Sequence, residues 1–145
     1  MKRMMLIGRS GAGKTTFCQA LNDLKLDYKK TQVIEFLDNA IDTPGEYMER
    51  QSLYRALIVT AIEADLIVMV QSITDEVCVF PPGLSGMFGK PAVGIISKTD
   101  LAEKPEMIEE AEQKLRLAGC DRIYPISSLR KDGLSEIRRF LEEEV

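Results

Sequence analysis

Histidine is absent from this sequence and cysteine is scarce, which argues against a metal site built from these residues. The three cysteines, Cys18, Cys78 and Cys120, lie far apart and show no Cys-x-x-Cys spacing. No histidine is present to complete a ligand set with them. We therefore expect three reduced thiols that serve as packing residues in a cytoplasmic protein.

Long apolar runs and an excess of basic residues are absent as well. A helix needs about 20 apolar residues to cross a bilayer, and no run in this sequence approaches that length. The short run at residues 4–7 stops at Gly8 without a secretion cleavage site. Lysine and arginine number 19 against 23 aspartates and glutamates, which gives a net charge of −4. These features predict a cytoplasmic protein with no membrane span and no nucleic-acid partner.

The 145 residues are enough for a single compact domain, residues 1–145, with an ordinary hydrophobic core. Short apolar runs alternate with amphipathic stretches, which predicts an α/β fold with a mostly parallel sheet. The expected strands are residues 4–7, 33–36, 39–42, 65–70, 92–96 and 122–126. The expected helices follow Gly13, cover residues 46–64 and 105–118, and bury Leu134, Ile137 and Leu141 near the C-terminus. So little chain separates the second and third strands that we expect an antiparallel hairpin, and hence one antiparallel edge strand.

The strongest motif is a P-loop that matches G-x-x-x-x-G-K-[ST] between the first strand and the first helix. Its glycines let backbone N–H groups face phosphate oxygens, and the following helix adds its positive N-terminal end. Lys14 is expected to act in catalysis by reaching the β- and γ-phosphates, and Thr15 to ligate Mg²⁺. The predicted nucleotide-binding residues are Gly8, Arg9, Ser10, Gly11, Ala12, Gly13, Lys14, Thr15 and Thr16.

A second motif, Asp42-Thr43-Pro44-Gly45, follows an apolar strand. A carboxylate at Asp42 can bind Mg²⁺ through water, and the Gly45 N–H can sense the γ-phosphate of a nucleotide held by the P-loop. Taken alone, the segment is also compatible with a plain turn. Beside the P-loop, we interpret it as part of the same site.

The segment Ser97-Lys98-Thr99-Asp100 resembles the base-reading N-K-x-D motif of the small GTPase superfamily. The resemblance implies that Asp100 accepts hydrogen bonds from guanine N1–H and its 2-amino group, and that the Lys98 stem lies along the base. Ser97 replaces the asparagine and removes an amide that braces the site, so we expect a weakened preference for guanine. Ser127 and Ser128 stand where the superfamily has its last base-contacting loop.

Two further roles follow from that resemblance, each with a plainer alternative. Thr31 lies in the segment that supplies a threonine to Mg²⁺ and the γ-phosphate, although it is equally well explained as a surface threonine in a polar loop. Glu46 stands where Ras-like proteins carry the glutamine that orients the attacking water. A carboxylate beside a triphosphate is repelled, so hydrolysis is expected to be slow. Alternatively, Glu46 only opens a helix at a favourable position.

The whole chain resembles the EutP/PduV-type proteins of ethanolamine and propanediol utilisation. The resemblance rests on the P-loop, on D-T-P-G-E-Y from Asp42, and on Phe80-Pro81-Pro82-Gly83-Leu84. It implies a three-layer P-loop NTPase fold of the Ras-like GTPase kind, nucleotide binding with Mg²⁺, and a cytoplasmic location tied to bacterial microcompartments. Members of the ethanolamine branch are also linked to acetate kinase activity.

Three functions stay open at this point. The first is a slow Mg²⁺-dependent NTPase that binds GTP or ATP, with GTP preferred because of Asp100. The second is an acetate kinase that moves phosphate between ATP and acetate. The third is an interaction protein, stabilised by nucleotide and with little turnover, whose partner is a microcompartment shell protein. Glu46 and the short segment around Thr31 favour the second and third.

The stretch Phe80 to Phe88 is the candidate surface for such a partner. Leu84, Met87 and Phe88 recur at offsets 0, 3 and 4, as on one face of a helical turn. That spacing favours packing of a single turn onto the sheet over an exposed docking surface.

Overall fold

The computed structural model describes residues 3–9, 11–26, 40–43, 45–127 and 133–142. The elements in chain order are β1 (Met4–Ile7), α1 (Lys14–Leu26), β2 (Ala40–Asp42), α3 (Glu46–Glu49), the 3₁₀ helix η1 (Gln51–Leu53), α4 (Tyr54–Ala61), β3 (Leu66–Ser72), α5 (Ser85–Phe88), β4 (Ala92–Ser97), the 3₁₀ helix η2 (Thr99–Leu101), α6 (Pro105–Ala118), β5 (Arg122–Pro125) and α7 (Leu134–Glu142).

The described strands form a five-stranded sheet in the order β2-β1-β3-β4-β5, and every pairing is parallel. Every residue of β3 and of β4 is buried, as the continuous apolar runs predict for strands covered on both faces. The antiparallel edge strand predicted at residues 33–36 lies outside the described residues. The expected third strand appears as β2, beside β1.

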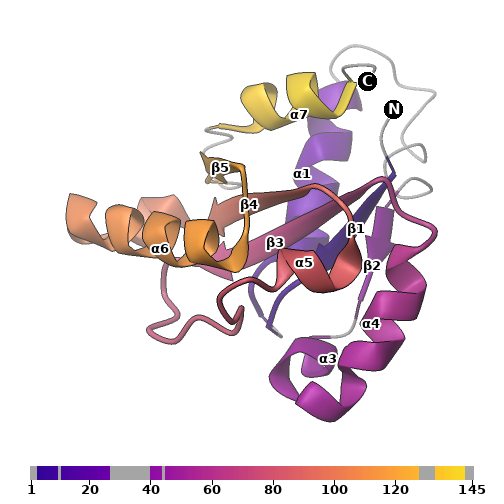
Figure 1. The fold of residues 1–145 in the computed structure, drawn as a ribbon. Coiled ribbons are helices and arrows are strands. Elements are labelled where there is room, and N and C mark those ends of the chain that lie inside the picture. Colours follow the sequence, from indigo (N-terminus) through magenta and orange to yellow (C-terminus); the bar gives the residue numbers. More distant parts are fainter. Residues whose placement is uncertain (1–2, 10, 27–39, 44, 128–132, 143–145) are drawn as a thin grey trace.

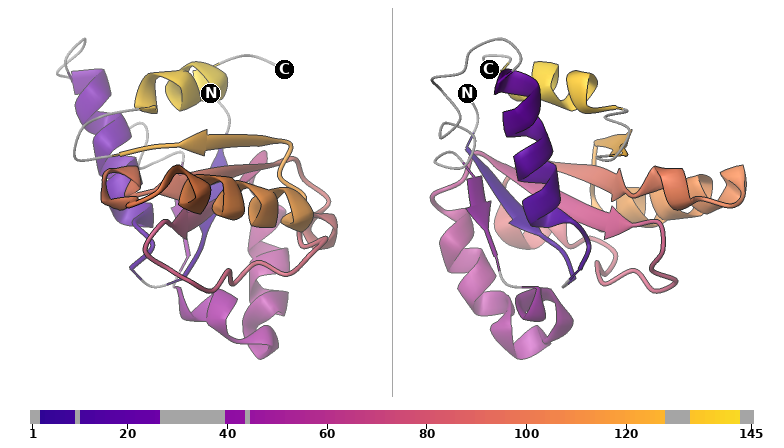
Figure 2. Two further views of the ribbon diagram at one scale, coloured as in Figure 1. Left: turned by 90° about the vertical axis from the view of Figure 1, so that its left-hand side faces the viewer. Right: turned by 180° about the vertical axis from the view of Figure 1, so that it is seen from behind.

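Helices cover both faces of this sheet (Figure 1). On one face, α1 and α7 pack against Met4 and Leu6 of β1 and the inward residues of β3 and β4. On the other face, α4, α5 and α6 pack against Met5 and Ile7 of β1 and the opposite side of β3 and β4. The views in Figure 2 show α1 and α7 together on their side of the sheet. The α/β fold of three layers is therefore confirmed.

The single helix expected over residues 46–64 is wrong. Arg50 has an extended conformation, with φ −128° and ψ 118°, and it separates α3 from η1 and α4. Met48 and Leu57 are both buried in the same core cluster. They lie nine residues apart (57 minus 48), or about two and a half turns, so one straight helix would place them on opposite sides. The break at Arg50 lets both side chains reach the core.

The segment before β4 packs as its spacing predicts. Leu84 is 1% exposed and Phe88 is 9% exposed, and both belong to the core that lies against α4 and α6. Met87, on the outer side of this short helix, is 42% exposed. Packing therefore accounts for two of the three apolar residues.

The cysteines are free thiols, as expected. Cys18 and Cys120 are buried, and Cys78 is partly buried. Burial raises the pKa of Cys120 to about 12 and also raises the pKa of Cys78. Both thiols are therefore protonated at neutral pH and behave as small apolar side chains. Among the described residues, no helix has the length and apolar character needed to cross a membrane.

The packing of α6 on the sheet predicts a large difference between two leucines of that helix. Leu115 is 0% exposed, whereas Leu117 is 66% exposed. Leu115→Ala should lower the free energy of unfolding by about 2–5 kcal/mol, because it leaves a cavity against β4. Leu117→Ala is the matched control and should change it by less than about 0.5 kcal/mol. Urea unfolding measures both, and equal losses would contradict the burial of α6.

Candidate functional site

The loops that follow the parallel strands meet at one edge of the sheet, because parallel strands end on the same side. The loop after β1 contains the P-loop residues, and β2 is followed by Thr43 and Gly45. The chain after β4 carries Lys98 to Asp100, and Ser127 lies shortly after β5. The sheet therefore brings all four predicted motifs together, although they are spread over more than a hundred residues of sequence.

The P-loop has the shape that its glycines permit. Gly11 and Gly13 have φ values of 83° and 102°, which side-chain-bearing residues rarely adopt. At Gly8, a Cβ would lie 2.6 Å from the carbonyl oxygen of Val70 in β3. Only glycine can therefore occupy position 8 while the chain leaves β1 this close to β3.

Lys14 lies at the first position of α1 and is 7% exposed. Its Nζ donates hydrogen bonds to the carbonyl oxygens of Gly8, at 2.9 Å, and Arg9, at 3.2 Å. The ammonium group is thus held over the loop, next to the N-terminal end of a 13-residue helix. Both features favour an anion at this place. A cavity of about 240 Å³ opens here, lined by Gly11, Gly13, Lys14, Thr15, Thr16 and Lys98.

Thr43 attaches the second motif to the first. Its buried hydroxyl donates a hydrogen bond of 2.7 Å to the Leu6 carbonyl oxygen, and its backbone N–H donates to the same oxygen at 3.3 Å. In the sheet, Asp42 pairs with Leu6. Gly45 is buried and accepts hydrogen bonds from the N–H groups of Met48 and Glu49 in α3. The backbone of the second motif is therefore anchored beside the P-loop.

Ser97 and Lys98 connect the base-reading segment to the P-loop. The Ser97 hydroxyl, in a side chain that is 4% exposed, donates a hydrogen bond of 2.6 Å to the Ala12 carbonyl oxygen. Lys98 Nζ donates to the Gly11 carbonyl oxygen at 2.8 Å. Lys98 has φ 60°, a conformation that costs a non-glycine residue on the order of 1 kcal/mol. Ser97 lacks the side-chain amide of the asparagine in the N-K-x-D motif, but its hydroxyl still connects this segment to the P-loop.

Asp100 is oriented by the loop after β5. The Ser127 hydroxyl donates a hydrogen bond of 2.8 Å to Asp100 Oδ1. Thr99 supports this arrangement, because its hydroxyl and its backbone N–H both donate to the Ile126 carbonyl oxygen, at 2.8 and 3.1 Å. Hydrogen bonds therefore link the P-loop to the β4 end, and the β4 end to the loop after β5.

Several predicted residues fall outside what the structure describes. Ser10, Thr31 and Ser128 are in this group, as are the side chains of Asp42 and Glu46. The remaining predicted residues of the P-loop, together with Gly45, Ser97, Lys98, Asp100 and Ser127, lie at the same edge of the sheet. Sequence reasoning missed the bracing roles of Thr43 and Thr99. The available signal was a hydroxyl residue within two positions of a strand end in each motif.

The Ser97 brace predicts a measurable loss of stability. Ser97→Ala removes the buried hydrogen bond to the Ala12 carbonyl oxygen and should lower the free energy of unfolding by about 1–3 kcal/mol. The control is Ser52→Ala, at an exposed position of η1, which should change it by less than about 0.5 kcal/mol. Urea unfolding compares the two variants. If both variants have the same free energy of unfolding, the Ser97–Ala12 hydrogen bond does not stabilise the fold.

Comparison with known proteins supports the fold. The chain is similar to the solved structure of translation elongation factor SelB from Methanococcus maripaludis, with a TM-score of 0.60 and 22% identity, covering 98% of this chain and 35% of that one. It is 25% identical to GTPase Era of Brucella suis over 97% of this chain and 51% of Era. Together with the parallel sheet and its helices, these similarities identify an α/β fold of the P-loop NTPase kind.

Two other relatives match the chain at higher sequence identity. "Propanediol utilization protein PduV" of Citrobacter freundii is 41% identical over 97% of this chain and 93% of its own. "Probable acetate kinase EutP" of Escherichia coli is 40% identical over 81% of this chain and 73% of its own. The model of a family described as "Ethanolamine utilisation - propanediol utilisation" matches residues 1–143. This match, together with the identity to PduV over nearly the whole of both chains, shows that the chain belongs to the PduV-EutP family.

Proposed function

We propose that this protein binds purine nucleoside triphosphates with Mg²⁺ and is a slow NTPase that prefers GTP. The observation that carries the proposal is the set of hydrogen bonds that joins the P-loop to Ser97 and Lys98 and then, through Thr99, to the loop that orients Asp100. A loop for phosphates and a carboxylate for a base are thereby parts of one connected site.

The phosphates would lie in the cavity between the P-loop and Lys98. Lys14 donates to two carbonyl oxygens of the loop, and these contacts can be exchanged for charge-assisted hydrogen bonds to phosphate oxygens. Lys98 already contacts Gly11 on the other side of the same cavity. Two lysines and a helix N-terminus thus offset the charge of the triphosphate, although the whole chain is acidic.

The residues around this cavity also fit a magnesium ion. Mg²⁺ prefers oxygen ligands and is usually shared between one or two protein groups and the phosphates. Thr15 lines the cavity, directly after Lys14. Asp42 pairs with Leu6 in the sheet, which places its backbone at the same edge. We assign Thr15 and Asp42 as the ion's protein ligands, with Thr31 as a further candidate; the ion would supply charge neutralisation at the phosphates.

Asp100 favours guanine over adenine for a simple reason of hydrogen bonding. A carboxylate only accepts hydrogen bonds at neutral pH, and guanine offers two donors on its Watson–Crick edge, N1–H and the 2-amino group. Adenine presents an acceptor at N1 instead. The hydrogen bond from Ser127 fixes how the Asp100 carboxylate is oriented, which reduces the entropy lost when a base binds.

Slow hydrolysis follows from the residue at position 46. The assigned water-orienting position carries Glu46, the first residue of α3. The negative charge of Glu46 repels the triphosphate.

A second candidate function comes from the name of the Escherichia coli relative, which suggests phosphate transfer between ATP and acetate. In this case the same Lys14 and P-loop would hold the donor nucleotide, and acetate would replace water as the acceptor. Association with a bacterial microcompartment, which the resemblance to the EutP/PduV-type proteins implies, is a further part of the proposal.

The turnover experiment separates the two reactions. Purified protein is given labelled GTP or ATP with Mg²⁺, with and without acetate, and free phosphate is measured against acetyl phosphate. We expect free phosphate, released faster from GTP, with a loss of about 100-fold or more in Lys14→Ala and in excess EDTA. Lys90→Ala, which changes a partly exposed lysine near the start of β4, at the opposite edge of the sheet, is the matched control and should keep full activity.

Other outcomes of that experiment would change the assignment. Acetyl phosphate that requires acetate and is lost in Lys14→Ala would make the protein a kinase. Retained nucleotide binding without turnover of either nucleotide would leave the nucleotide-stabilised interaction protein as the explanation.

Base recognition is tested by Asp100→Ala. Loss of the hydrogen bonds to a charged acceptor should weaken GTP binding by about 10- to 100-fold and ATP binding far less. Asp121→Ala removes an exposed carboxylate at the start of β5 and serves as the control. Calorimetric titration of the wild type and both variants with GTP and with ATP gives the dissociation constants needed. Equal weakening of both nucleotides by Asp100→Ala would sink the assignment of Asp100 to guanine.

A further inference from the structure

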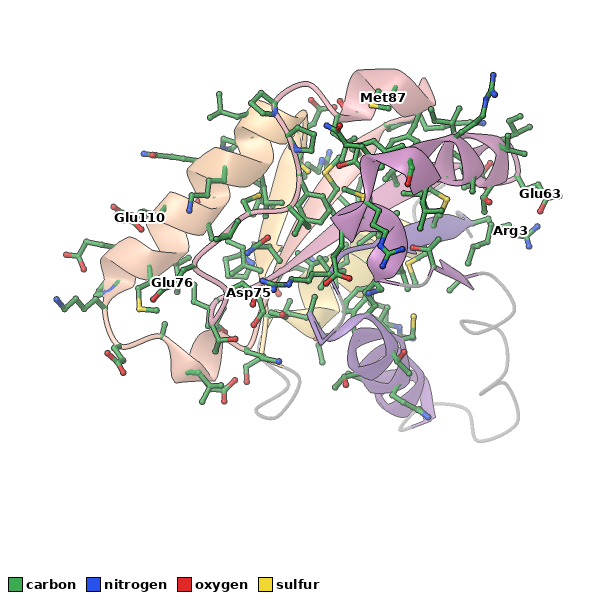
Figure 3. The ribbon with its side chains drawn as sticks, turned by 90° about the horizontal axis from the view of Figure 1, so that it is seen from below. Arg3, Glu63, Asp75, Glu76, Met87 and Glu110 are labelled. Carbon is green, nitrogen blue, oxygen red and sulfur yellow. The ribbon has the colours of Figure 1, made fainter. Side chains whose placement is uncertain are left out.

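Arg9 is the P-loop residue whose side chain leaves the loop and contacts acidic residues from two other segments. Its Nε lies 3.4 Å from Glu49 Oε1 at the end of α3. Its Nη1 lies 3.9 Å from Asp75 Oδ1 in the loop after β3. Figure 3 shows Asp75 turned toward the middle of the molecule, whereas its neighbour Glu76 lies beside α6. One guanidinium thus joins the P-loop to α3 and to the loop after β3.

The backbone of Arg9 is bound to the phosphate-binding machinery at the same time. Its carbonyl oxygen accepts a hydrogen bond from Lys14 Nζ at 3.2 Å and another from the Ala12 N–H at 3.0 Å. A displacement of Arg9 would therefore affect both Lys14, through the backbone of Arg9, and Glu49 at the end of α3, through its side chain.

The short helix α3 depends on such an external contact. It has four residues, and isolated helices of that length are unstable in water. Met48, 2% exposed, anchors it to the core, and the Arg9–Glu49 ion pair holds its end toward the P-loop. Next to it lies an open groove of about 500 Å³, lined by Arg9, Met48, Glu49, Tyr54, Val77 and Val79. The groove leaves α3 room to shift.

We propose that Arg9 is a positioning residue that couples α3 to the P-loop, so that the position of Gly45 and Glu46 and the binding of the third phosphate depend on each other. The inference rests on the proposed function, which gives Gly45 and Glu46 their roles at the γ-phosphate. Glu49 and Asp75 are the two partners through which Arg9 acts. The side chain of Arg9 serves as the link, and its backbone belongs to the phosphate-binding loop.

The strength of the contact suits a coupling element better than a structural support. Arg9, Glu49 and Asp75 have side chains that are 46%, 34% and 25% exposed. Ion pairs with this much exposure contribute little to global stability. Breaking them should therefore leave the fold intact and change the population of α3 conformations only a few-fold, which is the scale on which a ligand shifts an equilibrium.

The first test uses the free protein. Amide hydrogen exchange is measured in the wild type, Arg9→Ala, Glu49→Gln and the double variant. The reporters are the N–H groups of Met48 and Glu49, which donate to the Gly45 carbonyl oxygen. We expect faster exchange at both amides in each single variant, and no further increase in the double variant beyond Arg9→Ala, because the Arg9–Glu49 contact is already lost in each single variant. Arg9→Lys should restore part of the protection.

The matched control is Arg116→Ala. Arg116 forms an exposed ion pair with Glu112 within α6, at 3.0 Å. Its removal should leave exchange in α3 unchanged and should affect the thermal midpoint as little as Arg9→Ala does. If Met48 and Glu49 exchange equally fast in Arg9→Ala and Arg116→Ala, Arg9 does not hold α3 to the P-loop. This conclusion holds whether or not the protein binds nucleotide.

The second test measures affinity for GDP and for a non-hydrolysable GTP analogue. Arg9→Ala and Glu49→Gln should each weaken the triphosphate several-fold more than the diphosphate. An unchanged ratio alongside faster α3 exchange would overturn the coupling to the third phosphate and leave the proposed function standing. If the wild type binds neither nucleotide, the proposed function fails and the coupling fails with it.

Discussion

The site depends on one steric constraint, the close passage of the P-loop beside β3. A Cβ at Gly8 would lie 2.6 Å from the Val70 carbonyl oxygen, so the chain can leave β1 along this path only with glycine. The path brings Gly11 and Ala12 within hydrogen-bonding distance of Lys98 and Ser97 at the end of β4. It also lets Lys14 fold back over the carbonyl oxygens of Gly8 and Arg9. The contacts between the P-loop and the end of β4 depend on that geometry.

Hydrogen bonds at the end of β4 connect the P-loop, where phosphates are proposed to bind, to the segment around Asp100, where the base is proposed to bind. Ser97 holds Ala12, Thr99 holds Ile126, and Ser127 holds Asp100. A nucleotide that contacts both ends would therefore bind a scaffold that is already ordered, which reduces the entropic cost of association. The serine at position 97 keeps a link between the two regions with a shorter side chain. The Ser97 hydroxyl donates its hydrogen to the Ala12 carbonyl oxygen, so in the proposed function recognition of the base would depend on Asp100.

The sequence predicted those features that are encoded locally. The buried runs that form β3 and β4 and the spacing of α6 were found because hydrophobic periodicity is a local signal. The break at Arg50 was missed because it depends on how Met48 and Leu57 reach one core. The contacts of Ser97 with Ala12 and of Arg9 with Glu49 span 85 and 40 positions, and no local pattern encodes such pairings. The catalytic assignments of Lys14 and Glu46 and the metal assignments of Thr15, Thr31 and Asp42 stay predictions.

Two cations of the P-loop have different surroundings, and this separates their roles. Lys14 is buried at the N-terminal end of α1 and donates hydrogen bonds to carbonyl oxygens of the P-loop, a place that favours an anion. Arg9 faces two carboxylates, and its charge is already offset. An approaching triphosphate would therefore gain little from the Arg9 side chain, and its negative charge would repel Glu49 and Asp75. In such a loop, Lys14 would bind the phosphate, and Arg9 would transmit the effect of that binding to Glu49 and Asp75.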